Sequence, residues 1–343
     1  MRELTFCGPR VLDEELNSVA VCNYARLRRP HPRSIDCVGW PKVASARISY
    51  MASAWKYRAG EDIEPGSWEE CVQLLLASGG DDVLYRGHRK FDWKLESSLE
   101  RALQEHALEF EPEKYERLQS MAADAETERW TNTVEIGLMQ AFRRQAARFG
   151  IPDLPGARDL LGWWEVMQHH GAPTRLMDWT RSPFVAIWFA LDGHTDGEGD
   201  MALWVYDREV ASRALQPTLA RLRSTQGYER LDAREFQNKL VEYALEDRVP
   251  VLMPVTPRQF GRSVAQESVL TVSPRIDVGR PADWYLRQKL ATRLRLREEW
   301  KLAMQTACSS LGLSRVGLFR DLDSLGAAIS AAFRDNEPLP EAH

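Results

Sequence analysis

The sequence predicts an α+β fold in which helices surround a small mixed or antiparallel β-sheet. The composition is that of a globular protein, with 44% hydrophobic and 28% charged residues. Apolar residues recur at helical spacing in some segments and alternate with polar residues in others. The two kinds of segment are mixed without the regular strand–helix alternation of a parallel sheet, which favours α+β.

Residues 1–66 differ from the rest of the chain and are predicted to form an N-terminal extension. Residues 26–33 read RLRRPHPR, a basic run with two prolines and no periodicity. Residues 60–66 form a polar segment with a glycine at each end. The basic run fits either a solvated linker or an arm that contacts an acidic partner. Residues 67–335 are predicted to be one domain, followed by a short tail over 336–343.

Capping residues and apolar periodicity predict the helices. Ser67, with Glu70 three residues later, forms a capping box before a helix over Trp68–Ala77. Ser182 as N-cap and Pro183 in the first turn begin a second helix. The same signals predict four further helices, about Glu113–Phe149, Leu160–His170, Glu298–Leu311 and Asp323–Phe333.

Short apolar or alternating runs predict five strands. They are Asp82–Arg86, Met201–Tyr206, Val249–Val255, Ser268–Val272 and Ala291–Leu296. The segment Thr174–Trp179 is interpreted as a loop between two helices.

Composition and spacing exclude several classes of function. The net charge is -5 and the pI about 5.9, so the chain as a whole lacks a basic nucleic-acid footprint. No run approaches the roughly 20 apolar residues of a membrane helix. The five cysteines are spread out without Cys-x-x-Cys pairs, and the N-terminus lacks a signal region, so we expect a cytoplasmic protein. His169 and His170 point to different sides of a helix without a third ligand, so no metal is expected.

Four sequence blocks carry a family resemblance. The first opens with Tyr85-Arg86-Gly87 and runs to Trp93, and the second, QHHGAPTRLMDWT, begins at Gln168 and continues to Ala190. The others are Arg262–Ser268 and Leu318–Asp323. With these blocks the segment from about Trp68 to Ile329 resembles the FRG-domain family, named for its Phe/Tyr-Arg-Gly motif.

The same layout is similar to the Arg–Ser–Glu class of ADP-ribosyltransferases. In that class an Arg on the first core strand contacts NAD, a Ser/Thr motif leads into a helix, and a Gln/Glu-x-Glu turn opens a late strand. Arg86, Thr180 with Ser182, and Gln266 with Glu267 follow in that order. This resemblance implies a split sheet of the ADP-ribosyltransferase type, with NAD as the substrate.

Two alignments with this class place the catalytic residue at different positions. One alignment puts Ser268 where the class has its catalytic Glu, and a shift by one residue puts Glu267 there. A carboxylate can stabilise the positive charge that develops on the ribose as nicotinamide leaves, whereas a hydroxyl carries no charge. We therefore expect Glu267, with Gln266 and Arg86, to form the catalytic set.

The resemblance also implies a set of NAD-binding residues: Arg86, Gly87, His169, Thr174, Arg175, Thr180 and Ser182. A planar guanidinium can bind phosphate oxygens through two parallel hydrogen bonds. An equally weighted alternative makes both arginines structural. Arg86 would then pair with Asp178 or another buried acid, and Arg175 would pair with Asp178.

The leading function is an NAD-using ADP-ribosyltransferase-like enzyme or NAD glycohydrolase, of the kind used as a toxin or anti-phage defence effector. It would act on a protein or nucleic-acid target. The alternative is a non-catalytic FRG module that binds a nucleotide or a protein. A third class, nucleic-acid recognition through basic pieces at 26–33, 143–148 and 287–297, is disfavoured by the net acidity.

Overall fold

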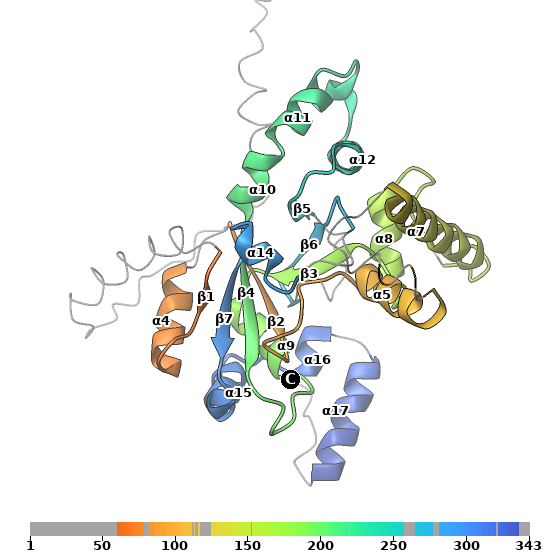
Figure 1. Ribbon diagram of the computed structural model, residues 1–343. Helices are drawn as coiled ribbons and strands as arrows, with labels where there is room; N and C mark the ends of the chain where they lie inside the picture. The colour runs from red at the N-terminus through yellow and green to blue at the C-terminus, as the bar shows by residue number, and fades with distance from the viewer. Residues whose placement is uncertain are drawn as a thin grey trace, which may run out of the picture.

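Figure 1 shows the computed structural model of the chain. It describes residues 60–78, 82–111, 113, 116, 125–151, 153–256, 265–276, 281–319 and 322–335. A seven-stranded sheet with the order β1-β7-β4-β2-β3-β6-β5 forms its centre. Helices cover this sheet, so the predicted α+β fold is confirmed.

The strands are β1 (Asp62–Ile63), β2 (Val83–His88), β3 (Leu176–Thr180), β4 (Met201–Asp207), β5 (Met253–Val255), β6 (Ser268–Val272) and β7 (Thr292–Leu296). All neighbours are antiparallel except β1 and β7, which are parallel, so the sheet is mixed. The five predicted strands correspond to β2, β4, β5, β6 and β7, and β5 is shorter than predicted. β1 and β3 were not predicted.

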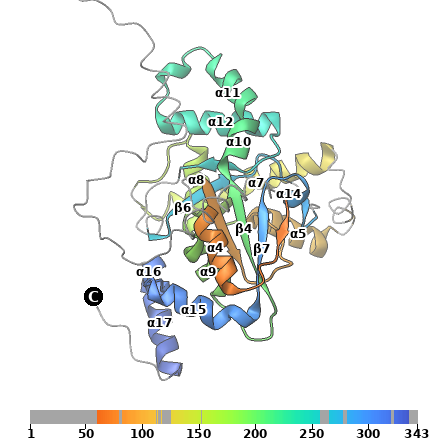
Figure 2. The same ribbon diagram turned by 90° about the vertical axis from the view of Figure 1, so that its left-hand side faces the viewer.

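The helices are α4 (Trp68–Ser78), α5 (Ser98–Phe110), α7 (Ala125–Ala146), α8 (Leu160–His169), α9 (Pro183–Leu191), α10 (Arg208–Ala214), α11 (Gln216–Arg223), α12 (Ala233–Asp247), α14 (Trp284–Arg287), α15 (Lys301–Ser310), α16 (Arg315–Phe319) and α17 (Leu322–Asp335). α7 lies inside the predicted helix at 113–149, part of which is outside the described residues. In Figures 1 and 2, α10, α11 and α12 lie at one end of the sheet and α15, α16 and α17 at the other.

The two faces of the sheet bury different clusters. On one face α9 packs on β2 and β4, and Tyr85, Ile187 and Leu203 belong to the cluster between them. On the other face Leu84, Trp179, Trp204 and Tyr206 join a larger cluster. That cluster also takes in side chains from α8, α12 and α14.

The predicted loop at 174–179 is wrong, because most of this segment belongs to β3, an interior strand of the sheet. β3 pairs with β6 through five residue pairs and lies beside β2. Leu176, Met177, Trp179 and Thr180 are buried, and only Asp178 is exposed. The turn formers Gly171 and Pro173 and the charge of Asp178 obscured the strand, which its two neighbours stabilise by backbone pairing.

Gly87 explains why the motif on β2 ends in glycine. A Cβ at this position would lie 1.8 Å from the backbone oxygen of Ala186 and 2.8 Å from the backbone nitrogen of Ala190. The backbone of α9 therefore rests directly on β2. Tyr85, 1% exposed, is buried under the same helix, so the first and third motif residues serve packing.

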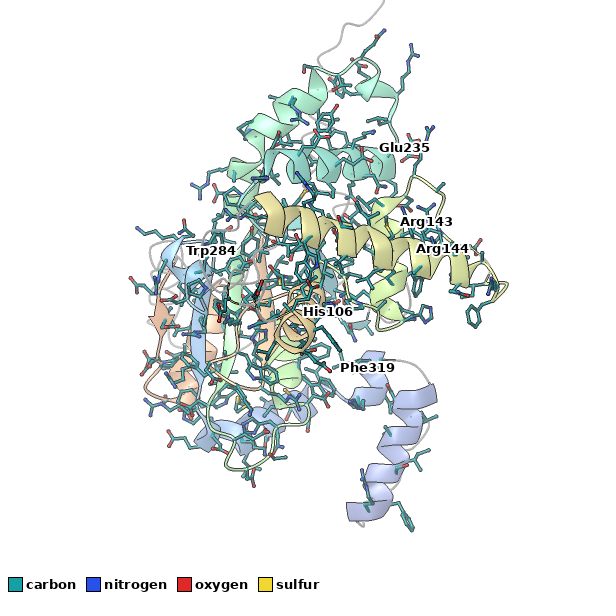
Figure 3. All side chains as sticks on the ribbon, turned by 45° about the vertical axis from the view of Figure 1, so that its right-hand side comes forward. His106, Arg143, Arg144, Glu235, Trp284 and Phe319 are labelled. Carbon is teal, nitrogen blue, oxygen red and sulfur yellow. The ribbon has the colours of Figure 1, made fainter. Side chains whose placement is uncertain are left out.

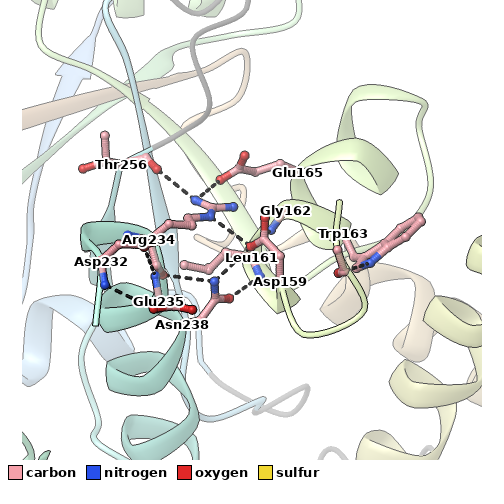
Figure 4. Close-up of polar contacts among 11 residues, drawn as sticks. Asp159, Leu161, Gly162, Trp163, Glu165, Asp232, Arg234, Glu235, Asn238 and Thr256 are labelled. Carbon is pink, nitrogen blue, oxygen red and sulfur yellow. Dashed lines mark hydrogen bonds and ion pairs between the residues drawn. The ribbon is translucent and has the colours of Figure 1, made fainter. Parts of the chain in front are cut away.

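A polar network anchors the first turn of α8 to α12 (Figure 4). Asp159 accepts a hydrogen bond from the Gly162 N–H and pairs with Arg234, whose guanidinium also binds Glu165. Asn238 accepts from the Leu161 N–H and donates to Asp159. The network fixes the start of the helix whose other end reaches the site described below.

The end of the predicted extension contributes to the sheet. β1 pairs with β7, and Ile63 is 6% exposed. Arg293 of β7 binds both carboxylate oxygens of Asp62, at 2.6 and 2.9 Å. The boundary at residue 66 remains a prediction, and so does the structure of residues 1–59, which lie outside the described residues. None of the described helices is long and apolar enough to cross a membrane.

Candidate functional site

The strands that carry the motif residues are neighbours in the order β2, β3, β6. Tyr85 lies opposite Thr180, and Thr180 lies opposite Ser268. Arg86 and Glu267 are thus separated by two strand spacings across the sheet and about two residues along it. With strands ~4.8 Å apart and a rise of ~3.3 Å per residue, their Cα atoms are about 12 Å apart.

Arg86 projects from the face of the sheet opposite α9. On one side it lies opposite Trp204 of the neighbouring strand β4. On the other side the register of β3 brings Trp179 next to it. Its Nη1 donates to the backbone oxygen of Asp178 at 2.7 Å, and its Nε donates to His88 Nε2 at 3.1 Å. Within the described part of the chain no carboxylate forms an ion pair with Arg86.

The electrostatic environment of Arg86 reflects this arrangement. Burial lowers the pKa of its guanidinium, the charge of Asp178 acts in the opposite direction, and the nearby Arg101 lowers it further. The side chain nevertheless stays partly exposed. The proposed ion pair with Asp178 is replaced by a hydrogen bond to the backbone of that residue.

His88, two residues after Arg86, lies on the same face and is 7% exposed. Burial sets its pKa well below the ordinary value, and the charges of Arg86, Arg101 and Arg293 add to this shift. The backbone of Trp93 acts on this pKa in the opposite direction. The imidazole is therefore neutral at physiological pH.

Thr174 and Gln168 hold the carboxylate of Asp178. Gln168 Nε2 donates to Asp178 Oδ2 at 2.6 Å, and Gln168 Oε1 accepts from the Thr174 hydroxyl at 2.9 Å. Thr174 is fully buried and also accepts from the Leu176 N–H. This chain of contacts links the end of α8 to β3.

Arg175 pairs with Glu135 and not with Asp178. Its Nε donates to Glu135 Oε1 at 2.7 Å, and its Nη2 binds Glu135 Oε2. Nη1 donates to the backbone oxygens of Ser273 and Pro274. The guanidinium, 3% exposed, also lies 5.3 Å from the ring centre of Trp164. These contacts occupy all three nitrogen atoms of the guanidinium.

Thr180 and Ser182 form hydrogen bonds that stabilise the connection between β3 and α9. The Thr180 hydroxyl donates to the backbone oxygen of Gln266 at 2.7 Å and accepts from the Ser182 N–H. Ser182 caps α9, as predicted, by accepting from the Val185 N–H. Gln266 is 8% exposed, and its Oε1 accepts from the Ser268 hydroxyl at 3.2 Å.

Glu267 differs from Ser268 in backbone and exposure. It is exposed, and its φ of 46° lies in the left-handed region, which is uncommon for a residue other than glycine. Its backbone oxygen accepts from the Arg181 N–H at 3.3 Å. Ser268 begins β6 and is paired inside the sheet. Strained backbone of this kind costs roughly 1–3 kcal/mol and clusters at functional sites.

Two histidines, His169 and His170, follow Gln168 at the end of α8. His169 and His170 are both exposed, and their ring centres are 5.0 Å apart. In the described ranges no group of three His, Cys, Asp or Glu side chains could hold a metal ion.

Sequence reasoning missed His88 as a site residue. The signal was present, because residues two apart on a strand share a face, and Arg86 was already a candidate. The strand pattern could not show that the two side chains are hydrogen-bonded to each other.

Comparison with known proteins gives one match. Residues 81–198 match the family model described as the FRG domain. The match contains the first two motif blocks, while the third and fourth lie beyond it. No curated protein and no solved structure matches the chain significantly.

Proposed function

We propose that this chain, which carries an FRG domain at residues 81–198, is an NAD-using enzyme that breaks the nicotinamide–ribose bond. The product is ADP-ribose, either transferred to a protein or nucleic-acid target or released by water. The proposal includes a role for the protein as a toxin or an anti-phage defence effector. Cys71 and Cys308 are free and buried, which fits action in a reducing cytoplasm.

The observation that carries the proposal is Arg86. It is a partly buried guanidinium with no ion-pair partner among the described residues, beside Trp179 and Trp204. A cation removed from water needs a compensating anion. The diphosphate of NAD would supply phosphate oxygens, which guanidinium groups bind well.

The position of Glu267 suits the chemical step. As the C1′–N bond breaks, its electron pair leaves with nicotinamide and positive charge develops on the ribose. The oxygen of water or of the target then bonds to C1′ and releases a proton. A carboxylate near this carbon stabilises the transition state electrostatically. The separation of about 12 Å from Arg86 leaves room for the linkage between the diphosphate and that ribose.

One observation favours the non-catalytic alternative. The Glu267 side chain is exposed and has no hydrogen-bond partner in the described part of the chain. A catalytic carboxylate is normally held in place by its neighbours. A module that binds a nucleotide through Arg86 without cleaving it would need no such support.

Nucleic-acid recognition by the basic pieces receives less support. Figure 3 shows Arg143 and Arg144 on α7, on the opposite side of the molecule from Trp284, which begins α14. Arg293 and Arg295 of β7 are paired with acidic residues. The described basic residues of these pieces therefore do not form one continuous cationic surface.

The decisive experiment is incubation of the protein with NAD labelled in its adenylate half. The proposal predicts nicotinamide release, together with label on a target or in free ADP-ribose. Binding of NAD without release would favour the binding module. Absence of NAD binding would overturn the enzyme and leave a module that binds another nucleotide or a protein.

A pair of neighbouring variants separates chemistry from binding. Glu267→Gln keeps the shape and removes the charge, so turnover should fall about 10²–10³-fold while NAD binding persists. Ser268→Ala is the matched control and should change turnover little. Arg86→Ala should weaken NAD binding itself. Unchanged turnover in Glu267→Gln would contradict the assignment of the carboxylate.

A further inference from the structure

The guanidinium of Arg86 is held at two points. Its Nε–H donates to His88 Nε2 at 3.1 Å, and Nη1 donates to the backbone oxygen of Asp178 at 2.7 Å. Among the described residues nothing accepts a hydrogen bond from Nη2. The two contacts come from different strands, β2 and β3, so they fix both the position and the plane of the guanidinium.

The contact with His88 determines which ring nitrogen carries the proton. Nε2 accepts a hydrogen bond from Arg86 and is therefore unprotonated, so the proton of the neutral ring is on Nδ1. Burial opposes protonation of this ring, and so do the charges of Arg86, Arg101 and Arg293. The protonated Nδ1 is buried and forms no hydrogen bond within the described part of the chain.

The surroundings keep the imidazole in one orientation. The ring centre of His88 lies 6.3 Å from that of Trp93 and 6.4 Å from that of Trp204, both in edge-to-face geometry. Trp204 is fully buried and Trp93 is 41% exposed. A ring locked in this way is a rigid acceptor, whereas a free arginine side chain samples many rotamers.

We propose that His88 is the positioning residue of the NAD site, which holds Arg86 so that its free Nη2 edge receives the phosphate oxygens. The inference rests on the proposed function. Fixing the guanidinium before the ligand arrives removes part of the ordering cost of binding. His88 itself need not touch NAD for this effect.

Two substitutions at one position test the role, because each mimics a different ring nitrogen. In His88→Gln the amide oxygen can reach the place of Nε2 and accept from Arg86. In His88→Asn the amide reaches only the place of Nδ1. A hydrogen bond to a charged group corresponds to a change of about 10–100-fold in affinity, so we expect the NAD dissociation constant of His88→Asn to rise by that factor. His88→Gln should stay within about threefold of wild type.

Calorimetric titration of NAD into each folded variant, with thermal melts as a check of folding, gives the comparison. Equal affinity of wild type and His88→Asn would overturn the positioning role. Equal weakening in both variants would overturn it too, since loss of ring packing would then be the cause.

A second measurement needs no NAD. Nitrogen-15 NMR of the histidine rings should show His88, identified by its absence in His88→Gln, as the Nδ1–H tautomer without titration between pH 7.5 and 5.5. An Nε2-protonated ring would overturn the inference. Failure of the wild-type protein to bind NAD would instead overturn the proposed function, so the two failures appear in different measurements.

Discussion

Consecutive residues of β2 divide their roles between the two faces of the sheet. Tyr85 and Gly87 meet α9, while Arg86 and His88 project from the opposite face. Because side chains alternate along a strand, one short motif can serve packing and binding together. The Phe/Tyr-Arg-Gly signature thus combines two structural residues with one candidate ligand residue.

The low pKa of His88 predicts how stability depends on pH. The unfolded chain protonates this histidine below its ordinary pKa of 6.5, while the folded protein keeps it neutral. The unfolded state then binds more protons, so stability is complete above about pH 6.5 and falls as the pH is lowered. The slope contributed by one proton is about 1.4 kcal/mol per pH unit.

Urea denaturation of wild type and His88→Gln between pH 7.5 and 5 measures this contribution. Other groups titrate equally in both proteins, so the difference between the two curves isolates His88. Parallel curves would contradict a depressed pKa.

The Arg175–Glu135 pair predicts a stability defect without a binding defect. Arg175→Ala leaves a buried carboxylate without its cation, which costs about 3–5 kcal/mol for a buried pair. Chemical denaturation measures the loss. Arg175→Ala with Glu135→Ala should be less destabilised than the sum of the single variants. Full stability with a selective loss of NAD binding would instead move Arg175 into the binding site.

Elements come together here through close backbone contact. β3 fills the gap between β2 and β6, and only two residues separate the end of β3 from the start of α9. The short connection places the capped end of α9 beside the start of β6, through Thr180 and Gln266. Any displacement of α9 would therefore disturb the site.

Gly87→Ala tests the contact between α9 and β2. The added methyl group would overlap the Ala186 backbone oxygen, so we expect destabilisation of at least about 1–3 kcal/mol. Gly137→Ala is the control, because nothing lies within 4 Å of its Cβ position on α7. That substitution should stabilise the protein by about 0.5–1 kcal/mol. Equal melting temperatures for the two variants would rule out the tight contact.

At the scale of the molecule, residues from the end of the predicted extension form β1, the strand at one edge of the sheet. Asp62 joins this edge to Arg293, whose side chain is 8% exposed. Arg293 also donates to the backbone oxygen of Phe91 and lies over its ring at 4.0 Å. The edge strand thus supports the segment that follows the Tyr-Arg-Gly motif.

Two truncations test the boundary. A chain that begins at Gly60 retains β1 and should melt cooperatively within a few degrees of the full-length protein. A chain that begins at Ser67 lacks Asp62 and leaves Arg293 without its carboxylate. Its melting temperature should fall by about 5–10 °C, since a lost partner of a buried charge costs a few kcal/mol. Identical melting curves would place the boundary after β1.

Local signals in the sequence were sufficient for much of the fold. The bounds of β6 and the start of α8 were predicted correctly, and Ser182 was recognised as the cap of α9. Periodicity and capping act over a few residues, so they can be read without knowledge of the partners. A capping box at Ser97 and Glu100, which begins α5, was equally visible but was overlooked.

The sequence by itself determined the α+β class, the FRG motif and the candidates Arg86 and Glu267. Only the tertiary structure decided that residues 176–180 form an interior strand, that Arg175 pairs with Glu135, and that Arg86 donates to His88. The physical reason is that pairing between distant segments depends on the whole sheet. Arg175 and Glu135, which form the buried ion pair, are 40 positions apart in the sequence. Arg293 and Asp62, which pair at the edge of the sheet, are 231 positions apart.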